Sequence, residues 1–291
     1  MSFHPDLRLP RFLPKAMVTP RSLRAIRLGV RLLPTRGRPR PDVVPVNAAV
    51  SVRVFRPASG GDGRALLWIH GGGMVIGAAK MDDVYCRRIA RGLGITVASV
   101  DYRLAPEHPY PLPLEDCYAA LQWLAAQPGT SRIAVGGASA GGGLAAGVTL
   151  AARDRGEVEV AAQLLVYPMI DDRSGVRTDV DDSVFRLWNR ASNRFGWSAY
   201  LRGLDDVPAY AAPARAEDLA GLPPTWIGVG THDLFHDEDV TYAERLRAAG
   251  VDVRLEVVPG AYHGFNAVEP GAQVTRDFDG SATRFLGEVL G

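Results

Sequence analysis

The feature that most constrains the fold is an alternation of apolar, strand-like segments with longer helix-like segments. The strand-like segments are Leu66–Ile69, Ile95–Val100, Ile133–Val135, Ala161–Tyr167, Thr225–Val229 and Val253–Val258. The helical patterns cover Asp83–Leu93, Leu114–Gln127, the residues after Ser139, Glu238–Ala249 and a terminal stretch ending near Leu290. This alternation predicts an α/β fold, a mostly parallel sheet with helices on both faces. Ligands then bind at the carboxyl ends of the strands.

Length and composition set the broad class. A chain of 291 residues accommodates one large α/β domain with a small lid, and a net charge of +1 provides no reason to expect a nucleic acid partner. Cys86 and Cys117 cannot form a disulfide framework, and both lie in helix-like stretches, so we expect buried free thiols. No apolar run is long enough for stable membrane insertion. The default expectation is a cytoplasmic protein, and a homodimer stays open.

Positive charge is concentrated at the N-terminus. Residues 1–40 contain nine Arg and one Lys against the single acid Asp6, a local balance of +9. The segment Arg21–Leu33 places Leu23, Ile26, Val30 and Leu33 near helical spacing. We therefore expect a helix laid over the body of the chain with its arginines in water. Docking on an anionic membrane surface is the minority interpretation.

A serine flanked by small residues follows the strand Ile133–Val135. It forms the pattern G-x-S-x-G with Gly137, Ser139 and Gly141, which is typical of a nucleophile held at a tight turn between a strand and a helix. Neither a Lys nor a phosphate-loop pattern follows, which argues against a phosphate site. An upstream strand runs into His70-Gly-Gly-Gly73. The two motifs in this order are the arrangement of lipases and esterases with an α/β-hydrolase sheet.

A serine nucleophile needs a base and a group that orients the base, and this sheet supplies them in the order Ser, acid, His. His263 follows the strand ending at Val258, as a base at a strand end should. Asp233 is the first carboxylate after the preceding strand. The later acids Asp237, Glu238 and Asp239 are better interpreted as charges at the start of a helix.

The acidic loop has a rival interpretation as a metal site. His232 and His236 are four residues apart, with Asp233 and Asp237 close by. The segment follows a strand directly and resembles a loop as far as Asp237, and the sequence offers no third spaced ligand. We expect neither a metal nor any other cofactor.

Taken together, these motifs are similar to those of the hormone-sensitive-lipase-like family of α/β-hydrolase esterases. The resemblance rests on His70–Gly73, Asp101–Pro109, Gly137–Gly142, Tyr167-Pro168 with Asp171, Asp233 with Asp237, and His263–Phe265. It implies a carboxylesterase with Ser139 as nucleophile, Asp233 as acid and His263 as base. It also implies an oxyanion hole built from the backbone N–H groups of Gly72, Gly73 and Ala140. Ala138 and Met74 depart from the family pattern, in which an acid or Thr and an aromatic residue are usual.

The resemblance further implies a cap over the site. The cap would comprise residues 1–45 and the insertion 172–215, and the hydrolase core would comprise 46–171 and 216–291. We expect the substrate pocket to be lined by Met74, Phe185, Trp188 and Trp197. Because no long apolar surface run is found in the cap sequence, we expect short- to medium-chain acyl esters as small-molecule substrates.

Three further expectations concern chemistry and support. Arg103, Glu107 and His108 are expected to hold the loops around the oxyanion hole as a polar network. An amide or lactone hydrolase with the same triad is an alternative, because the chemistry is shared. A non-catalytic binding protein on the same fold is the alternative from another class, and retention of Ser, Asp and His disfavours it.

Overall fold

The computed structural model describes residues 2–16, 18–35, 37–57, 60–177 and 181–291. Its strands are β1 Asp42–Pro45, β2 Ser51–Phe55, β3 Arg64–Ile69, β4 Thr96–Asp101, β5 Arg132–Ala138, β6 Ala162–Val166, β7 Thr225–His232 and β8 Val253–Tyr262. Its α-helices are α1 Leu23–Leu32, α2 Asp83–Leu93, α3 Leu112–Ala125, α4 Ala140–Arg155, α5 Arg190–Leu201, α6 His236–Ala248, α7 Phe265–Val268 and α8 Gln273–Leu290. Short 3-10 helices are η1 Ala79–Asp82, η2 Ser174–Val176 and η3 Pro213–Arg215.

The strands form one sheet in the order β1-β2-β4-β3-β5-β6-β7-β8. Pairing is parallel from β4 through β8, and β2 pairs antiparallel with both β1 and β4. The expected α/β fold is confirmed. One boundary of the predicted cap is wrong, because β1 pairs with β2 in the sheet. We therefore end the N-terminal cap segment before Asp42; the rest of the predicted domain division stays a proposal.

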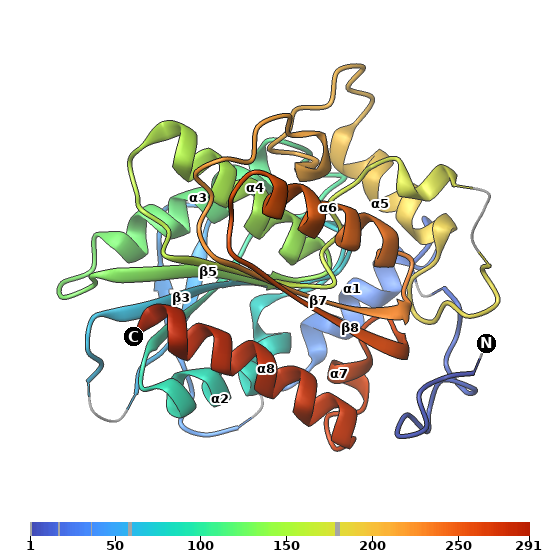
Figure 1. Ribbon diagram of the computed structural model, residues 1–291, viewed down its shortest axis with the longest axis horizontal. Helices are drawn as coiled ribbons and strands as arrows, with labels where there is room; N and C mark the ends of the chain where they lie inside the picture. Colours follow the sequence, from blue (N-terminus) through green and yellow to red (C-terminus); the bar gives the residue numbers. More distant parts are fainter. Residues whose placement is uncertain (1, 17, 36, 58–59, 178–180) are drawn as a thin grey trace.

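Helices cover both faces of the sheet (Figure 1). α3, α4 and α6 lie on one face, and their buried side chains share a core with Leu67 and Ile69 of β3. α2 and α8 lie on the other face, where the core includes Leu66 and Trp68. Neighbouring residues of β3 thus point to opposite faces, as the two-residue period of a strand requires. Burial on both faces explains why the central strands are almost continuously apolar.

The predicted thiols and the predicted N-terminal helix are both present. Cys86 of α2 and Cys117 of α3 are buried and free, as expected. α1 packs on the body of the chain, but its arginines are not all in water. Arg27 donates to the carbonyls of Val75 (2.7 Å) and Ala105 (2.5 Å) and pairs with Glu107. The helical pattern of α1 does not predict these contacts, because the carbonyls that accept from Arg27 belong to loops that are distant in sequence.

The N-terminal segment and the insertion contact each other. The Leu187 N–H donates to the Pro14 carbonyl (2.8 Å), and Ser192 Oγ donates to the Val18 carbonyl (2.9 Å). Both segments lie at the end of the sheet toward which the β7 arrow points (Figure 1). Residues 1, 17 and 36 of the first predicted cap segment and 178–180 of the second lie outside the described residues. Across the described ranges, none of the helices has the length and apolar character needed to cross a membrane.

Candidate active site

Ser139 lies at the turn between β5 and α4, with φ of 58° and ψ of −123°. This conformation is strained for a residue other than Gly and holds the side chain at the carboxyl end of the sheet. The neighbouring glycines leave no room for a side chain. A Cβ on Gly137 would lie 2.3 Å from the carbonyl oxygen of Gly141, and a Cβ on Gly141 would lie 2.1 Å from that of Ile69. Both glycines are thus required by close backbone contact.

A continuous hydrogen-bonded chain runs from a carboxylate to this serine. His263 Nε2 lies 2.9 Å from Ser139 Oγ, and His263 Nδ1 lies 2.7 Å from Asp233 Oδ2. The second oxygen of Asp233 accepts from the Phe235 N–H at 3.0 Å. All three residues of the chain are buried. A carboxylate can accept only from a protonated Nδ1, so the lone pair of Nε2 faces the serine hydroxyl. This arrangement can remove a proton from Ser139.

Two aromatic rings fix the position of His263. The rings of Tyr167 and Phe235 stand edge-on to the imidazole, with centroids at 4.8 Å and 5.1 Å. The Tyr167 hydroxyl donates to Asn266 Oδ1 at 2.7 Å, three residues beyond the histidine. Tyr167 belongs to one of the sequence motifs, but the motif did not predict this contact. A tyrosine directly after the strand next to β5 was the available signal.

The His70–Gly73 loop lies against the serine turn. A Cβ on Gly71 would lie 2.9 Å from the Ala138 carbonyl oxygen and 3.3 Å from the Cβ of Ser139. Gly72 and Gly73 have φ of 123° and 60°, which favour glycine. Within the described chain, the backbone N–H groups of Gly72, Gly73 and Ala140 donate to no protein acceptor. Free amides at a helix start and a glycine loop can stabilise a developing oxyanion.

The four residues predicted to line the substrate pocket are all buried. Trp188 covers the glycine loop, because a Cβ on Gly73 would lie 2.0 Å from its ring. Met74 is the next residue and has φ of 60°. Phe185 and Trp197 belong to the same apolar cluster, and the Trp197 ring lies 6.1 Å from that of Tyr200.

One residue beside His263 was not predicted from the sequence. Leu187 is within 3.5 Å of the position that a Cβ on Gly264 would occupy, and Gly264 directly follows His263. Leu187 has φ of 66°, so it lies in the left-handed region. A sequence pattern provides no signal for such a conformation in a leucine.

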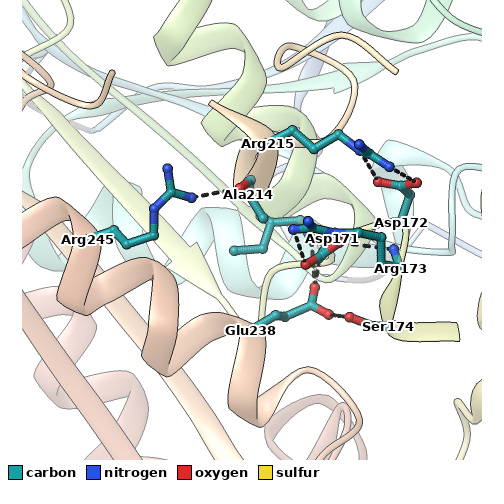
Figure 2. A network of polar contacts seen from close by, with 9 residues as sticks. Asp171, Asp172, Arg173, Ser174, Ala214, Arg215, Glu238 and Arg245 are labelled. Carbon is teal, nitrogen blue, oxygen red and sulfur yellow. Dashed lines mark hydrogen bonds and ion pairs between the residues drawn. The ribbon is translucent and has the colours of Figure 1, made fainter. Parts of the chain in front are cut away.

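The acids Asp237, Glu238 and Asp239 lie in the first turn of α6, as expected, but Glu238 and Asp239 are also buried, which the sequence did not predict. Glu238 accepts from the N–H groups of Ile170 (2.8 Å) and Asp171 (3.1 Å) and forms a short contact with Ser174 Oγ (Figure 2). Burial raises the pKa of Glu238 well above its ordinary value. Asp239 is also buried, and burial likewise raises its pKa. Asp237 instead pairs with Arg177 at 2.7 Å.

Glu238 belongs to a clamp at the base of the insertion. It holds the chain where the insertion begins, while Arg245 of the same helix donates to the Ala214 carbonyl (2.7 Å) and forms a short contact with that of Ala216, where the insertion ends. Arg215 pairs with Asp172 at 2.7 Å and connects the two ends directly (Figure 2). α6 follows the Asp233 loop, so one helix supports both that loop and the base of the insertion.

The alternative metal site receives no geometric support. His232 is buried with its ring edge-on to Phe3 at 5.1 Å, and burial lowers its pKa. His236 Nδ1 instead lies 2.7 Å from Asp237. In the part of the chain that the structure describes, no group of three His, Cys, Asp or Glu side chains is placed to hold a metal ion.

Of the predicted loop network, two residues make the expected kind of contact. Arg103 pairs with Asp116 of α3 at 2.6 Å, and Glu107 pairs with Arg27 of α1 at 2.8 Å. His108 lines a hollow beside these pairs.

Known proteins are similar to this chain in sequence and in fold. The profile of a family described as alpha/beta hydrolase fold matches residues 66–267. The esterase LipI of Mycobacterium tuberculosis is 40% identical over 228 residues, which cover 74% of this chain and 71% of that protein. A bacterial heroin esterase superposes with a TM-score of 0.86 at 39% identity, over 100% of this chain and 98% of the other.

A third similarity is to an esterase described as a member of the bacterial hormone-sensitive lipase family. Its structure superposes with a TM-score of 0.86 at 31% identity and covers 100% of both chains. The family match covers well over half of this chain, and the sequence and structural similarities agree with it. The chain therefore belongs to the α/β-hydrolase-fold family, among its hormone-sensitive-lipase-like esterases, and is a serine ester hydrolase.

Proposed function

We propose that this enzyme hydrolyses short- to medium-chain acyl esters through an acyl-enzyme intermediate on Ser139. The single observation that carries the proposal is the hydrogen-bonded chain from Asp233 through His263 to Ser139. In the first half-reaction, the proton of Ser139 moves to His263 Nε2 while Oγ attacks the ester carbonyl carbon. The imidazolium then protonates the departing alcohol oxygen, and the C–O bond to the alcohol breaks.

In the second half-reaction, His263 takes a proton from water, and the resulting hydroxide attacks the acyl-enzyme carbonyl. The proton returns to Ser139 Oγ as the acid is released. Asp233 holds the imidazole in the required tautomer and stabilises its positive charge. The free N–H groups of Gly72, Gly73 and Ala140 would bind the negative carbonyl oxygen in both steps.

The preference for shorter acyl chains rests on how closely the site is covered. Ser139 is 6% exposed and His263 is 8% exposed. Trp188 lies directly over Gly73, so an acyl chain must fit beneath the cap beside Met74, Phe185 and Trp197. A covered pocket limits the length of the acyl chain by the volume that it encloses.

A fluorophosphonate label tests the nucleophile. We expect the label to bond Ser139 in the wild type, with no labelling of Ser139→Ala, and kcat of that variant to fall roughly 10⁴-fold or more. A panel of acyl chain lengths, with matched amides and lactones, then tests the substrate class. Labelling elsewhere, or a preference for emulsified long-chain esters, would contradict the proposal.

We further propose that this enzyme is cytoplasmic and acts without a cofactor. Light scattering would measure whether it forms a homodimer. The buried free thiols of Cys86 and Cys117 are compatible with a reducing compartment.

A further inference from the structure

The outer surface of α1 and the start of α2 carry exposed apolar side chains that we call the α1 patch. Its members and their exposed fractions are Leu28 (58%), Leu32 (74%), Leu33 (41%), Met81 (47%) and Val84 (56%). The helical spacing predicted arginines on the other faces of this helix and Leu33 on the face toward the body of the chain, but Leu33 is exposed. The inner side is already occupied, because Leu23 and Val30 are buried against the body of the chain. The exposed leucines are therefore additional to those that hold the helix in place.

The patch draws on two segments that are distant in sequence and lie beside each other. The ammonium group of Lys80 donates to the carbonyls of Arg31 (2.6 Å) and Leu33 (2.9 Å), which places the end of α1 beside η1. Met81 directly follows Lys80, and Val84 lies in the first turn of α2. Leu28 and Leu32 are four residues apart on α1, so they lie on one face of the helix.

The border of the patch is positively charged. Arg21, Arg24 and Arg31 are exposed, and among the described residues none of them pairs with a carboxylate.

Each of the nearby acids has a hydrogen-bond or ion-pair partner other than these three arginines. Asp83 is buried in an ion pair with Arg53 (2.7 Å), Asp82 accepts from Trp68 Nε1 (2.7 Å), and Glu107 pairs with Arg27. Asp101 accepts from the Ala79 N–H at 3.0 Å. Exposed apolar side chains bordered by unpaired arginines match the interface between lipid headgroups and acyl chains.

We propose that the α1 patch docks this enzyme on an anionic lipid surface. Leu28 and Leu32 enter the boundary between headgroups and acyl chains, while the arginines contact lipid phosphates. A second copy of this chain is a poorer occupant, because a twofold interface joins the same surface of both copies and would bring two positively charged borders together. The inference does not depend on the proposed hydrolysis, since binding involves none of the groups around Ser139.

The docked helix also touches the site from outside. Arg27, on the inner side of α1, holds the Val75 carbonyl, and Val75 follows Gly73 by two residues. The membrane surface would thus lie one helix away from the glycine loop. Such docking concentrates the enzyme where amphiphilic esters partition.

Vesicle co-sedimentation tests the proposal, with the full chain mixed with vesicles of phosphatidylcholine alone or of phosphatidylcholine with phosphatidylglycerol. We expect at least tenfold stronger binding to the anionic vesicles, falling as salt is raised. Leu32→Ser should weaken that binding about tenfold, because a leucine leaves the interface. Leu204→Ser is the matched control, since Leu204 is an exposed leucine beside Asp205 and Asp206. It should bind as the wild type does.

Charge variants and solution mass complete the test. Arg24→Gln with Arg31→Gln should remove most of the preference for anionic vesicles, whereas Arg284→Gln should not. Thermal melting shows whether each variant is folded, and running the assay on Ser139→Ala separates binding from hydrolysis. Equal binding to neutral and anionic vesicles would overturn the proposal. So would unchanged binding by Leu32→Ser, or a wild-type dimer that this substitution converts to a monomer.

Discussion

Replacing Glu238 by Met should destabilise the protein through the hydrogen bonds that the carboxylate accepts. Methionine has nearly the same length but accepts none of the three, so the donors of Ile170, Asp171 and Ser174 would lose their partner. A buried donor without a partner costs about 1–3 kcal/mol. The half-buried Asp171 N–H can reach water, and removal of a buried carboxylate offsets part of the loss. We expect a net loss of roughly 3 kcal/mol, or roughly 5–10 °C in Tm for a chain of this size.

Glu238→Gln is the informative comparison. Its carbonyl oxygen can accept from both backbone N–H groups, and its amide can donate to the Ser174 oxygen, so all three contacts persist. Glu244→Met changes an exposed glutamate of the same helix and should leave Tm almost unchanged.

The dependence on pH has a defined sign. Because burial raises the pKa of Glu238 in the folded state, the folded protein holds this proton more tightly than the unfolded chain does. The contribution of Glu238 to stability is therefore greatest below its unfolded pKa of about 4.3 and is lost as pH rises toward the folded pKa. Gln does not titrate, so the Gln variant should gain on the wild type as pH rises.

Scanning calorimetry across this pH range measures both effects. A Met variant that melts with the wild type would refute the hydrogen-bond accounting. A Gln variant as unstable as the Met variant would show that the negative charge, and not the pattern of acceptors, is what matters at this position.

Three further outcomes are expected. Asp233→Asn should lower kcat on the order of 10⁴-fold by favouring the wrong imidazole tautomer. Asp237→Asn should lower kcat far less, since Asp237 pairs with Arg177 and His236. Steady-state kinetics with the opposite ranking would assign the role of the acid to Asp237. Ester hydrolysis should survive EDTA, and loss on chelation with recovery on adding a divalent ion would revive a site at His232 and His236. Deleting residues 1–35 should raise KM and lower Tm together, because it removes the Val18 and Pro14 carbonyls and the Arg27 side chain from their partners. Ser139 should still react with a small phosphonate. An unchanged KM would show that the N-terminus is not part of the site.

Local constraints made much of this protein predictable from sequence. The tight turn at Ser139 excludes a Cβ at Gly137 and Gly141 through contacts with adjacent backbone, so the pattern of residues records the geometry directly. The apolar period of each strand and helix indicates which side faces a core, and the fold class followed from it. Asp233 and His263 could be proposed because each follows a strand whose carboxyl end lies at the same edge of the sheet.

Tertiary structure decided what depends on a partner from elsewhere in the chain. The sequence places Glu238 and Asp239 at the start of a helix, but only the packing of the insertion against α6 makes them buried. Arg27 and Leu28 are neighbours on α1, yet the loop beneath the helix takes the arginine and leaves the leucine exposed. Leu187 adopts a left-handed conformation that its residue type disfavours. In each case the deciding contact joins residues far apart in the chain, and the periodicity of a single segment carries no record of what packs against it.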